Sequence, residues 1–361
     1  MGSRESSQAV GMDPGPIAMG TVDPRDSAAE MAEVRELLEG NDLTLEAGIE
    51  VFVVGRSQGR IVACAGLDHA TIKCVAVARA WRGESLSLRL GTEIVRVAAQ
   101  RGRYRLFLYT PPPKQQFFRG WGFNPIVEVP GLVVFMENSP TGIREHCDRL
   151  RAERRAGRKI GGIVLNANPF TLGHRYLVEQ AAAACEWLHV FVVGEDASYF
   201  SYADRIALVA AGVKGIDNLT LHAGSDYIIS RATFPGYFLR DEATVARSWA
   251  AIDLLVFREY IAPALAITHR FVGTEPFDAV TDTYNAEMQH WLQEAARAAP
   301  PVIVVEVPRA TVRDVPISAS EVRRRLTHGD LAGVDELVPP TTLEFLKARL
   351  GPSHQRSATG G

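Results

Sequence analysis

The residues best suited to chemistry lie between Ile163 and His174, where the chain reads Ile-Val-Leu-Asn-Ala-Asn-Pro-Phe-Thr-Leu-Gly-His. A short apolar run ends there in a turn, and Gly173-His174 stands at the start of a helical pattern. The free N–H groups and the positive dipole end of a helix start bind anions, and an adjacent imidazole adds another hydrogen-bonding group. The segment therefore predicts a phosphate site that follows a β-strand.

A second segment near the end of the chain offers related chemistry. Residues 317–323 read Ile-Ser-Ala-Ser-Glu-Val-Arg, which places two hydroxyls and a guanidinium at one predicted helix start. Ser318 and Glu321 match the Ser-x-x-Glu pattern of a capping box, so a helix cap without a ligand is one interpretation. The other is a pyrophosphate cradle built from Ser318, Ser320, Arg323 and the helix N–H groups.

Length and composition limit the class of protein. The length of 361 residues favours two domains. The net charge of -3 gives no excess of basic residues that would indicate binding to nucleic acid or to an anionic membrane. No apolar run approaches the roughly 18 residues of a membrane helix. The four cysteines lack a Cys-x-x-Cys spacing, which favours reduced thiols over a zinc site or disulfides. We therefore expect a cytoplasmic protein that binds neither nucleic acid nor membranes.

Composition also divides the chain. Gly, Ser, Pro and Asp are frequent at the N-terminus, and Arg and Lys gather after Cys147 among acidic residues. The predicted parts are a disordered, tag-like segment (1–28), a first domain (29–140), a basic linker (141–160) whose residues 148–159 should form a solvated helix, a second domain (161–350) and a disordered tail (351–361). Both phosphate-binding segments thus fall in the second domain.

The first domain has an α+β pattern. The predicted elements are strands at 49–55, 60–66, 72–77 and 106–109 and a helix at 86–98. Arg82-Gly83 precedes the helix, and the aromatic run Phe117–Phe123 follows the last strand. This order resembles the GNAT acetyltransferase fold. In that family the Arg-Gly turn continues with small residues whose amides hold the acetyl-coenzyme A pyrophosphate. Ser85 and Ser87 replace two of its glycines here and crowd that backbone, which favours a binding or docking domain over an active acetyltransferase.

The second domain alternates strands with helices. Strands are predicted around 163–165 and at 189–193, 219–222, 270–273 and 302–307, with helices around 174–188, 204–211, 241–257 and 285–298. This α/β alternation favours a Rossmann-like, doubly wound parallel sheet. Its ligand should lie at the carboxyl ends of the strands, where both phosphate-binding segments would meet.

The two segments also carry a family resemblance. The run from Asn168 to His174 resembles the Asp-Pro-x-(His/Thr)-x-Gly-His signature of the nucleotidyltransferases, and residues 317–323 resemble their Ile-Ser-x-(Ser/Thr)-x-x-Arg signature. Asn168 replaces the aspartate of that signature. The resemblance implies that ATP is attacked at its α-phosphate. The implied catalytic residues are His174 and Thr171, and the implied nucleotide-binding residues are Asn168, Phe170, Gly173, Gly273, Glu275, Ser318, Ser320 and Arg323.

The region between the two signatures narrows the resemblance. Residues 224–235, 268–276 and 284–288, with Ile252-Asp253 and Tyr260–Pro263, resemble the citrate lyase ligase family, which also joins a GNAT-like domain to a nucleotidyltransferase domain. That family implies ATP and Mg²⁺ as cofactors and acetate as substrate. It further implies that acetyl-adenylate acetylates the thiol of the coenzyme A-derived prosthetic group on the acyl carrier subunit of citrate lyase, with release of AMP and pyrophosphate.

Two alternatives belong to other classes. One is an adenylyltransferase that makes a dinucleotide or dephospho-coenzyme A, for which the two signatures suffice. The other is a non-catalytic module that binds coenzyme A or a carrier protein. The sequence also does not decide whether Arg231, Arg270 or Lys159 is the cation that would bind acetate.

Overall fold

The structure is a computed structural model that describes residues 16–194, 198–230, 234–239, 241–274, 279–313, 315–331 and 333–349. The chain forms two compact units. The first unit comprises Met1–Pro140 and Pro235–Arg240, and the second comprises Thr141–Phe234 and Asp241–Gly361. The predicted tail (351–361) and most of the predicted N-terminal segment (1–15) lie outside the described residues.

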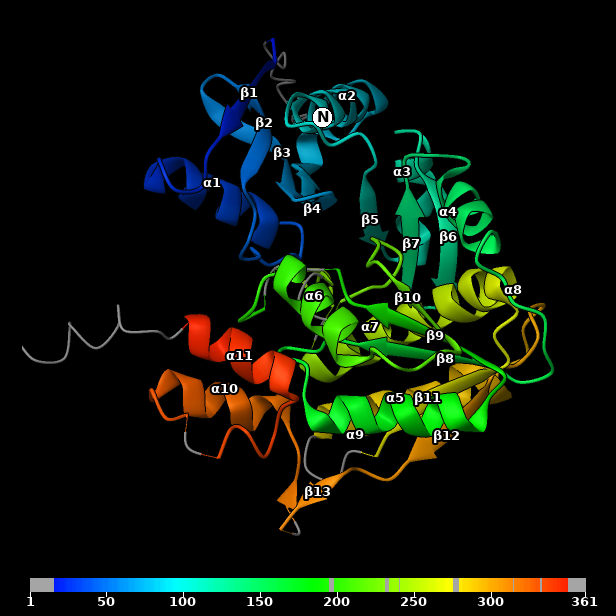
Figure 1. The fold of residues 1–361 in the computed structure, drawn as a ribbon. Helices are drawn as coiled ribbons and strands as arrows, with labels where there is room; N and C mark the ends of the chain where they lie inside the picture. Colours follow the sequence, from blue (N-terminus) through cyan, green and yellow to red (C-terminus); the bar gives the residue numbers. More distant parts are fainter. Residues whose placement is uncertain are drawn as a thin grey trace, which may run out of the picture. The chain divides into compact units, whose positions relative to one another are not determined.

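The first unit is built on a seven-stranded sheet in the order β1-β2-β3-β4-β5-β7-β6. Its elements are β1 (Ala18–Val22), α1 (Ala28–Glu39), β2 (Val51–Ser57), β3 (Arg60–Asp68), β4 (Thr71–Val77), η1 (Arg79–Trp81), α2 (Glu84–Gln100), β5 (Phe107–Thr110), η2 (Pro112–Lys114), α3 (Gln115–Arg119), β6 (Asn124–Val129) and β7 (Val133–Glu137). In this sheet β4 and β5 pair in parallel, and the other neighbours are antiparallel. Helices α1 and α2 cover opposite faces, each over its own hydrophobic cluster (Figure 1). The predicted α+β pattern is confirmed.

Strand β1 departs from the sequence prediction, which leaves residues 1–28 outside the fold. It pairs with β2 from Ala18 opposite Arg56 to Val22 opposite Phe52. Met19 packs against the cluster under α2, whereas Val22 is buried in the cluster under α1. The composition of the segment hides this strand because its stability comes from pairing with β2 and from contacts on both faces.

Helix α4 (Gly142–Arg151) lies within the predicted basic linker, and one of its faces is packed. Ile143, Cys147 and Leu150 are buried, and they recur at the spacing of one helix face. That face contacts η3 (Phe257–Ile261) and α8 (Ala262–Leu265). The helix ends at Arg151, and the basic side chains of Arg154, Arg155 and Arg158 follow it in exposed, non-helical chain of the second unit.

A short segment from the later part of the chain completes the first unit. Tyr237 is buried in the cluster under α1, and its backbone N–H donates to a Glu46 carboxylate oxygen at 2.9 Å. Its carbonyl oxygen accepts from the Thr44 N–H at 3.1 Å. Residues 235–240 are therefore part of the first unit, although they are distant from it in sequence.

The second unit contains a five-stranded parallel sheet in the order β10-β9-β8-β11-β12. Besides the helices named above, its elements are β8 (Ile160–Leu165), α5 (Leu172–Ala184), β9 (Trp187–Val192), α6 (Tyr202–Gly212), β10 (Leu219–His222), α7 (Glu242–Val256), β11 (His269–Gly273), α9 (Ala279–Met288), η4 (Gln289–Glu294), β12 (Ile303–Val307), β13 (Thr311–Val312), β14 (Val315–Pro316), α10 (Ala319–Thr327) and α11 (Pro340–Arg349). The chain runs outward from β8 to β10 and then returns to β8's other side with β11. This doubly wound order confirms the predicted fold class and places a topological switch between β8 and β11.

Both faces of this sheet are covered by helices. Helices α5 and α6 pack on one face, where alternate residues of β8 and β9 such as Ile163 and Val190 are fully buried (Figure 1). On the other face Phe191 of β9 contacts Phe257 at the end of α7 edge to face. A sheet covered on both faces presents its ligands at the carboxyl ends of its strands.

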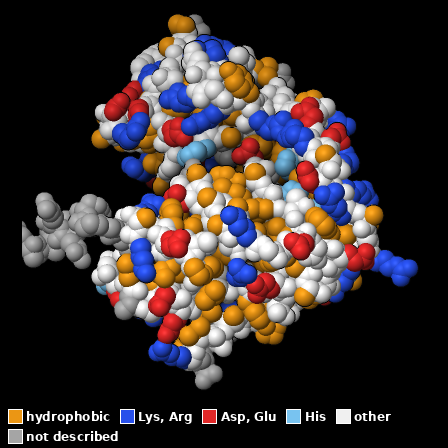
Figure 2. Space-filling view, viewed as in Figure 1, with side chains coloured by type: hydrophobic (Ala, Val, Ile, Leu, Met, Phe, Trp, Pro, Cys, Tyr) orange, Lys and Arg blue, Asp and Glu red, His pale blue; other side chains and the backbone are white. Residues whose placement is uncertain are grey.

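Two further features concern the charges on the surface and the apolar character of the helices. Basic and acidic side chains are interspersed on the face shown in Figure 2. Across the described ranges, no helix combines the length and the apolar character that a membrane span needs.

Candidate functional site

A cavity of about 1420 Å³ lies at the switch point of the second unit. Its lining includes residues at the carboxyl ends of β8 and β11 and the starts of α5 and α10. Seven of the ten residues that the sequence predicts for the site line this cavity: Thr171, Gly173, His174, Gly273, Ser318, Ser320 and Arg323. Segments far apart in the sequence thus meet at one cavity, as the parallel sheet requires.

Thr171 and His174 form a reciprocal cap at the start of α5. The Thr171 hydroxyl accepts from the His174 backbone N–H at 3.3 Å, and His174 Nδ1 accepts from the Thr171 backbone N–H at 3.0 Å. The imidazole takes the place that Glu or Gln holds in the usual capping box. The histidine is therefore fixed to the helix start by its own Nδ1.

The cap determines which nitrogen of the His174 ring is available to bind a ligand. Because Nδ1 accepts a hydrogen bond, the neutral ring carries its proton on Nε2. Burial, together with the charges of Arg309 and Arg323, lowers the pKa of His174 to about 4. The unfolded chain binds this proton more readily, so the contribution of His174 to stability is lost as the pH falls from about 6.5 towards the folded pKa. At neutral pH the ring offers one N–H donor.

Two predicted nucleotide-binding residues support the loop instead of lining the cavity. Phe170 is fully buried and stacks on the His174 ring at a centroid distance of 5.7 Å. A Cβ on Gly212 of α6 would lie only 2.3 Å from the Phe170 ring, so the helix packs tightly beneath it. The buried Asn168 side chain accepts from the Phe200 N–H at 3.1 Å. Both side chains hold the loop under the imidazole and are turned away from the cavity.

The start of α10 faces the same cavity. Ser318 is the N-cap, and its hydroxyl accepts from the Glu321 N–H at 3.1 Å. Arg323 donates from Nη2 to the Ser320 hydroxyl at 2.9 Å and from Nη1 to the Asn168 carbonyl oxygen at 2.5 Å. The guanidinium therefore joins α10 to the loop that carries His174.

Glu321 does not complete the predicted capping box. Its carboxylate binds Arg324 and Arg325 at 2.7 and 2.8 Å instead. Hydrogen bonds from both arginines lower the pKa of Glu321 to about 2. This carboxylate is directed along the helix, and the Ser318 hydroxyl serves as the side-chain cap at the start of α10.

Gly173 allows the two segments to approach each other. A Cβ at this position would lie 3.2 Å from the carbonyl oxygen of Ile317, closer than ordinary van der Waals contact. By contrast, a Cβ on Gly273, at the end of β11, would meet no atom within 4 Å. Gly173 is thus needed for packing of the protein itself, and Gly273 borders open cavity. Glu275, the remaining predicted residue, lies outside the described residues.

Arg205 is a buried residue of the site that the sequence prediction misses. Its Nη1 donates to the carbonyl oxygens of Asn166 and Val193 at 2.9 and 2.8 Å, and to Asn166 Oδ1 at 3.0 Å. It therefore ties together the chain segments that leave β8 and β9. Its place on the buried face of α6, with Leu208 and Val209, is the signal that could have identified it.

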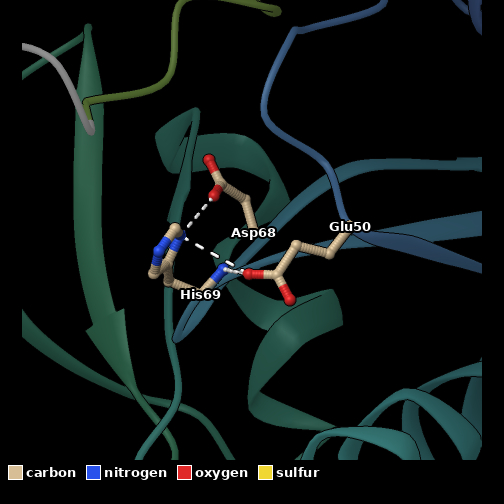
Figure 3. A group of neighbouring side chains, drawn as sticks. All are labelled: Glu50, Asp68 and His69. Carbon is tan, nitrogen blue, oxygen red and sulfur yellow. Dashed lines mark hydrogen bonds and ion pairs between the residues drawn. The ribbon is translucent and has the colours of Figure 1, made fainter. Parts of the chain in front are cut away.

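A cluster of side chains in the first unit has the atoms that could bind a metal ion, but its carboxylates form ion pairs within the protein. Ligand atoms of Glu50, Asp68 and His69 lie within 4.8 Å of one another (Figure 3). Arg103 binds both Glu50 oxygens at 2.8 and 2.9 Å, and Lys73 binds Asp68 at 2.8 Å. The carboxylates are therefore neutralised by cations of the protein.

The first unit also holds a cavity of about 940 Å³ beside the start of α2. Ser87, which replaces a glycine of the GNAT pattern, is buried, and its hydroxyl accepts from Trp121 Nε1 at 3.0 Å. The hydroxyl is thus occupied by a contact within the unit.

The doubly wound sheet and the two helix starts at its switch point define a nucleotide-binding α/β protein. Comparison with known sequences gives the family. The profile of the citrate lyase ligase C-terminal domain matches residues 160–346. The chain is 46% identical over 334 residues to the citrate (pro-3S)-lyase ligase of Escherichia coli (strain K12). This match covers 92% of this chain and 95% of that protein. The chain is 48% identical over 322 residues to the protein of that name from Klebsiella pneumoniae, with 89% and 94% covered. The chain belongs to the citrate lyase ligase family.

Some solved structures are similar to parts of this chain at low identity. Escherichia coli ElaA is 17% identical with a TM-score of 0.30, and the match covers 34% of this chain and 99% of that one. Thermotoga maritima TmcAL, in a structure with alpha-thio ATP, is 11% identical with a TM-score of 0.35, and the match covers 53% and 56%.

The protonation of His174 can be measured by NMR. In the free protein we expect the imidazole to titrate with a pKa of about 4, because burial and two nearby arginines disfavour its charged form. Its nitrogen shifts should report a proton on Nε2 at neutral pH. A titration near 6.5, the usual value for histidine, or a proton on Nδ1 would contradict the capped geometry.

Proposed function

We propose that this chain activates acetate with ATP and transfers the acetyl group to the thiol of the coenzyme A-derived prosthetic group on the acyl carrier subunit of citrate lyase. AMP and pyrophosphate are the other products, and the reaction takes place in the cytoplasm. Membership of the citrate lyase ligase family supports this function. The observation that carries the proposal is the meeting of His174, Arg323 and two helix starts at one cavity.

In the first step, an acetate oxygen forms a bond with the α-phosphorus of ATP while the bond from that phosphorus to the bridging oxygen breaks. Pyrophosphate leaves with the electrons of that bond, and acetyl-adenylate remains. The Nε2–H of His174 and the N–H groups at the start of α5 would donate to the phosphate oxygens as charge moves onto the leaving group. This step requires alignment and charge neutralisation but no protein nucleophile.

Arg323 and the start of α10 would hold the β- and γ-phosphates. Arg323 is held by Ser320 and by the Asn168 carbonyl oxygen, so its position is set before the nucleotide arrives. The hydroxyls of Ser318 and Ser320 line the same cavity and can add hydrogen bonds to the phosphates. A fixed guanidinium and helix N–H groups act on pyrophosphate without reorganisation.

Mg²⁺ would accompany the nucleotide. The carboxylates of Glu321 and Glu336, which line the cavity, are each bound to arginine. A magnesium ion prefers oxygen ligands and retains several waters, so phosphate oxygens and water would supply most of its coordination. When bound, the ion would add to the neutralisation of the phosphate charge.

In the second step, the thiol sulfur of the prosthetic group attacks the acetyl carbon of acetyl-adenylate. The bond from that carbon to the AMP oxygen breaks, AMP leaves, and the thiol loses its proton as the thioester forms. The His174 ring would keep its hydrogen bond to the phosphate of AMP through both steps, which stabilises each leaving group in turn.

Exchange of labelled pyrophosphate into ATP tests the proposed function. The exchange occurs only while an acceptor is reversibly adenylated, so we expect it to require acetate. Exchange supported by a nucleotide or phosphopantetheine would indicate an adenylyltransferase, and no exchange with any acceptor would indicate a binding module.

In the same assay His174→Ala should lower acetate-dependent exchange by about 10²- to 10³-fold, the usual effect of removing one such donor. His69→Ala, which changes an exposed histidine of the first unit, is the matched control and should leave exchange unchanged.

Adjacent arginines of α10 test the phosphate site. Arg323→Ala should weaken the binding of a non-hydrolysable ATP analogue by about tenfold or more, since a charged hydrogen-bonding partner is lost. Arg324→Ala removes an exposed arginine that binds Glu321, and it should change the affinity by less than about twofold. Titration calorimetry measures both. Equal losses in the two variants would count against the assigned role of Arg323.

A further inference from the structure

The cavity of the second unit extends beyond the phosphate-binding residues to a second polar group. Arg270 of β11, Asp253 of α7 and Tyr284 of α9 line it together. In β11 Arg270 and Phe271 point to opposite faces of the sheet, and Phe271 belongs to the core under α5. Arg270 therefore lies on the α7 face, apart from the helix starts that surround His174.

Arg270 is a buried cation with unused hydrogen-bonding capacity. Its side chain is 3% exposed, and its guanidinium lies 4.4 Å from the ring centroid of Phe257. Among the described residues, Nη1 has no hydrogen-bond partner. An unpaired buried polar group costs free energy, and the cost is higher when the group is charged. This arginine is thus poised for an anionic ligand in the cavity.

Asp253, a carboxylate that lines the same cavity as Arg270, is occupied by other donors. Asp253 Oδ1 accepts from the Ile229 N–H at 3.0 Å, and Oδ2 accepts from the Tyr284 hydroxyl at 2.7 Å. No ion pair within 4.0 Å joins it to Arg270 in the described part of the chain. Burial raises the pKa of Asp253, although the Tyr284 hydrogen bond and the charge of Arg270 act in the opposite direction. Asp253 positions Tyr284 and the backbone near Ile229 and leaves Arg270 Nη1 available.

The geometry also separates Arg270 from the other cations proposed for acetate. Lys159 precedes β8, so it stands at the amino edge of the sheet, opposite the edge that carries His174. Arg231 lies outside the described residues. Arg323 is held by Ser320 and Asn168 at the phosphate end.

We propose that Arg270 binds the carboxylate of the acid substrate in the part of the cavity bounded by α7 and α9. The assignment rests on the proposed function, because it supplies the acid that attacks the α-phosphate. Arg270 Nη1 donates to one carboxylate oxygen, and the second oxygen is free to face the nucleotide. Ile229, Trp249 and Met288 line the same cavity with largely apolar surface, which suits the methyl group of acetate.

The chemistry predicts when Arg270 acts. The carboxylate is an anion before it attacks the phosphorus, and the acetyl group of the mixed anhydride carries no charge. Arg270 should therefore contribute to the capture of acetate and much less to the use of acetyl-adenylate.

Arg270→Gln tests this site. We expect the KM for acetate in ATP–pyrophosphate exchange to rise by about 30- to 100-fold, the effect of losing a charged hydrogen bond. The KM for ATP should change by less than about twofold. Arg270→Lys keeps the charge but lacks the planar fork of donors. It should raise the KM for acetate by a smaller factor, and it provides the test if the glutamine variant does not fold.

Supplied acetyl-adenylate gives a readout that separates substrate binding from a structural role. Both variants should transfer its acetyl group to the carrier thiol at close to the wild-type rate. Loss of this transfer together with exchange would mean that Arg270 only supports the fold. A folded variant with an unchanged KM for acetate would also overturn the proposal. Absence of exchange in the wild-type protein would instead contradict the proposed function, so the two failures are distinguishable.

Discussion

The hydrogen bond from Arg323 to the carbonyl oxygen of Asn168 is the contact on which the site depends. It joins residues 155 positions apart in the sequence, one within α10 and one in the loop after β8. The other terminal nitrogen of the Arg323 guanidinium, Nη2, donates to the Ser320 hydroxyl, and Gly173 lets the loop approach Ile317 without a clash. Two helix starts are therefore held around one cavity. Each start alone is a common feature, but together they can neutralise several phosphate charges.

The cavity divides the chemistry between two ends. In the function proposed above, His174 and Arg323 at one end would bind the phosphates, and Arg270, on the opposite face of the sheet from α5, would bind the acid. This separation would keep the acid from competing with the triphosphate for the same guanidinium. The protein then needs only to hold the two reactants in line and to stabilise the leaving groups, which accounts for most of such catalysis.

The predictable features were those that local sequence specifies. The spacing of Gly173, His174, Ser318 and Arg323 located both helix starts, and the apolar runs located the strands of the parallel sheet. Local spacing could not show that the imidazole caps its own helix, nor that Phe170 and Asn168 are turned away from the cavity, because these depend on packing against α6 and Phe200. Strand β1 and residues 235–240 were missed for a related reason, since their stability comes from distant partners.

Attack of acetate on the α-phosphorus of ATP is tested most directly with acetate labelled with ¹⁸O in both oxygens. After transfer to the carrier thiol, the acetate oxygen that formed the bond to phosphorus must remain with AMP. We expect one ¹⁸O atom in each AMP released, detected by mass spectrometry, and none in pyrophosphate. Unlabelled AMP, or label in pyrophosphate or inorganic phosphate, would contradict it.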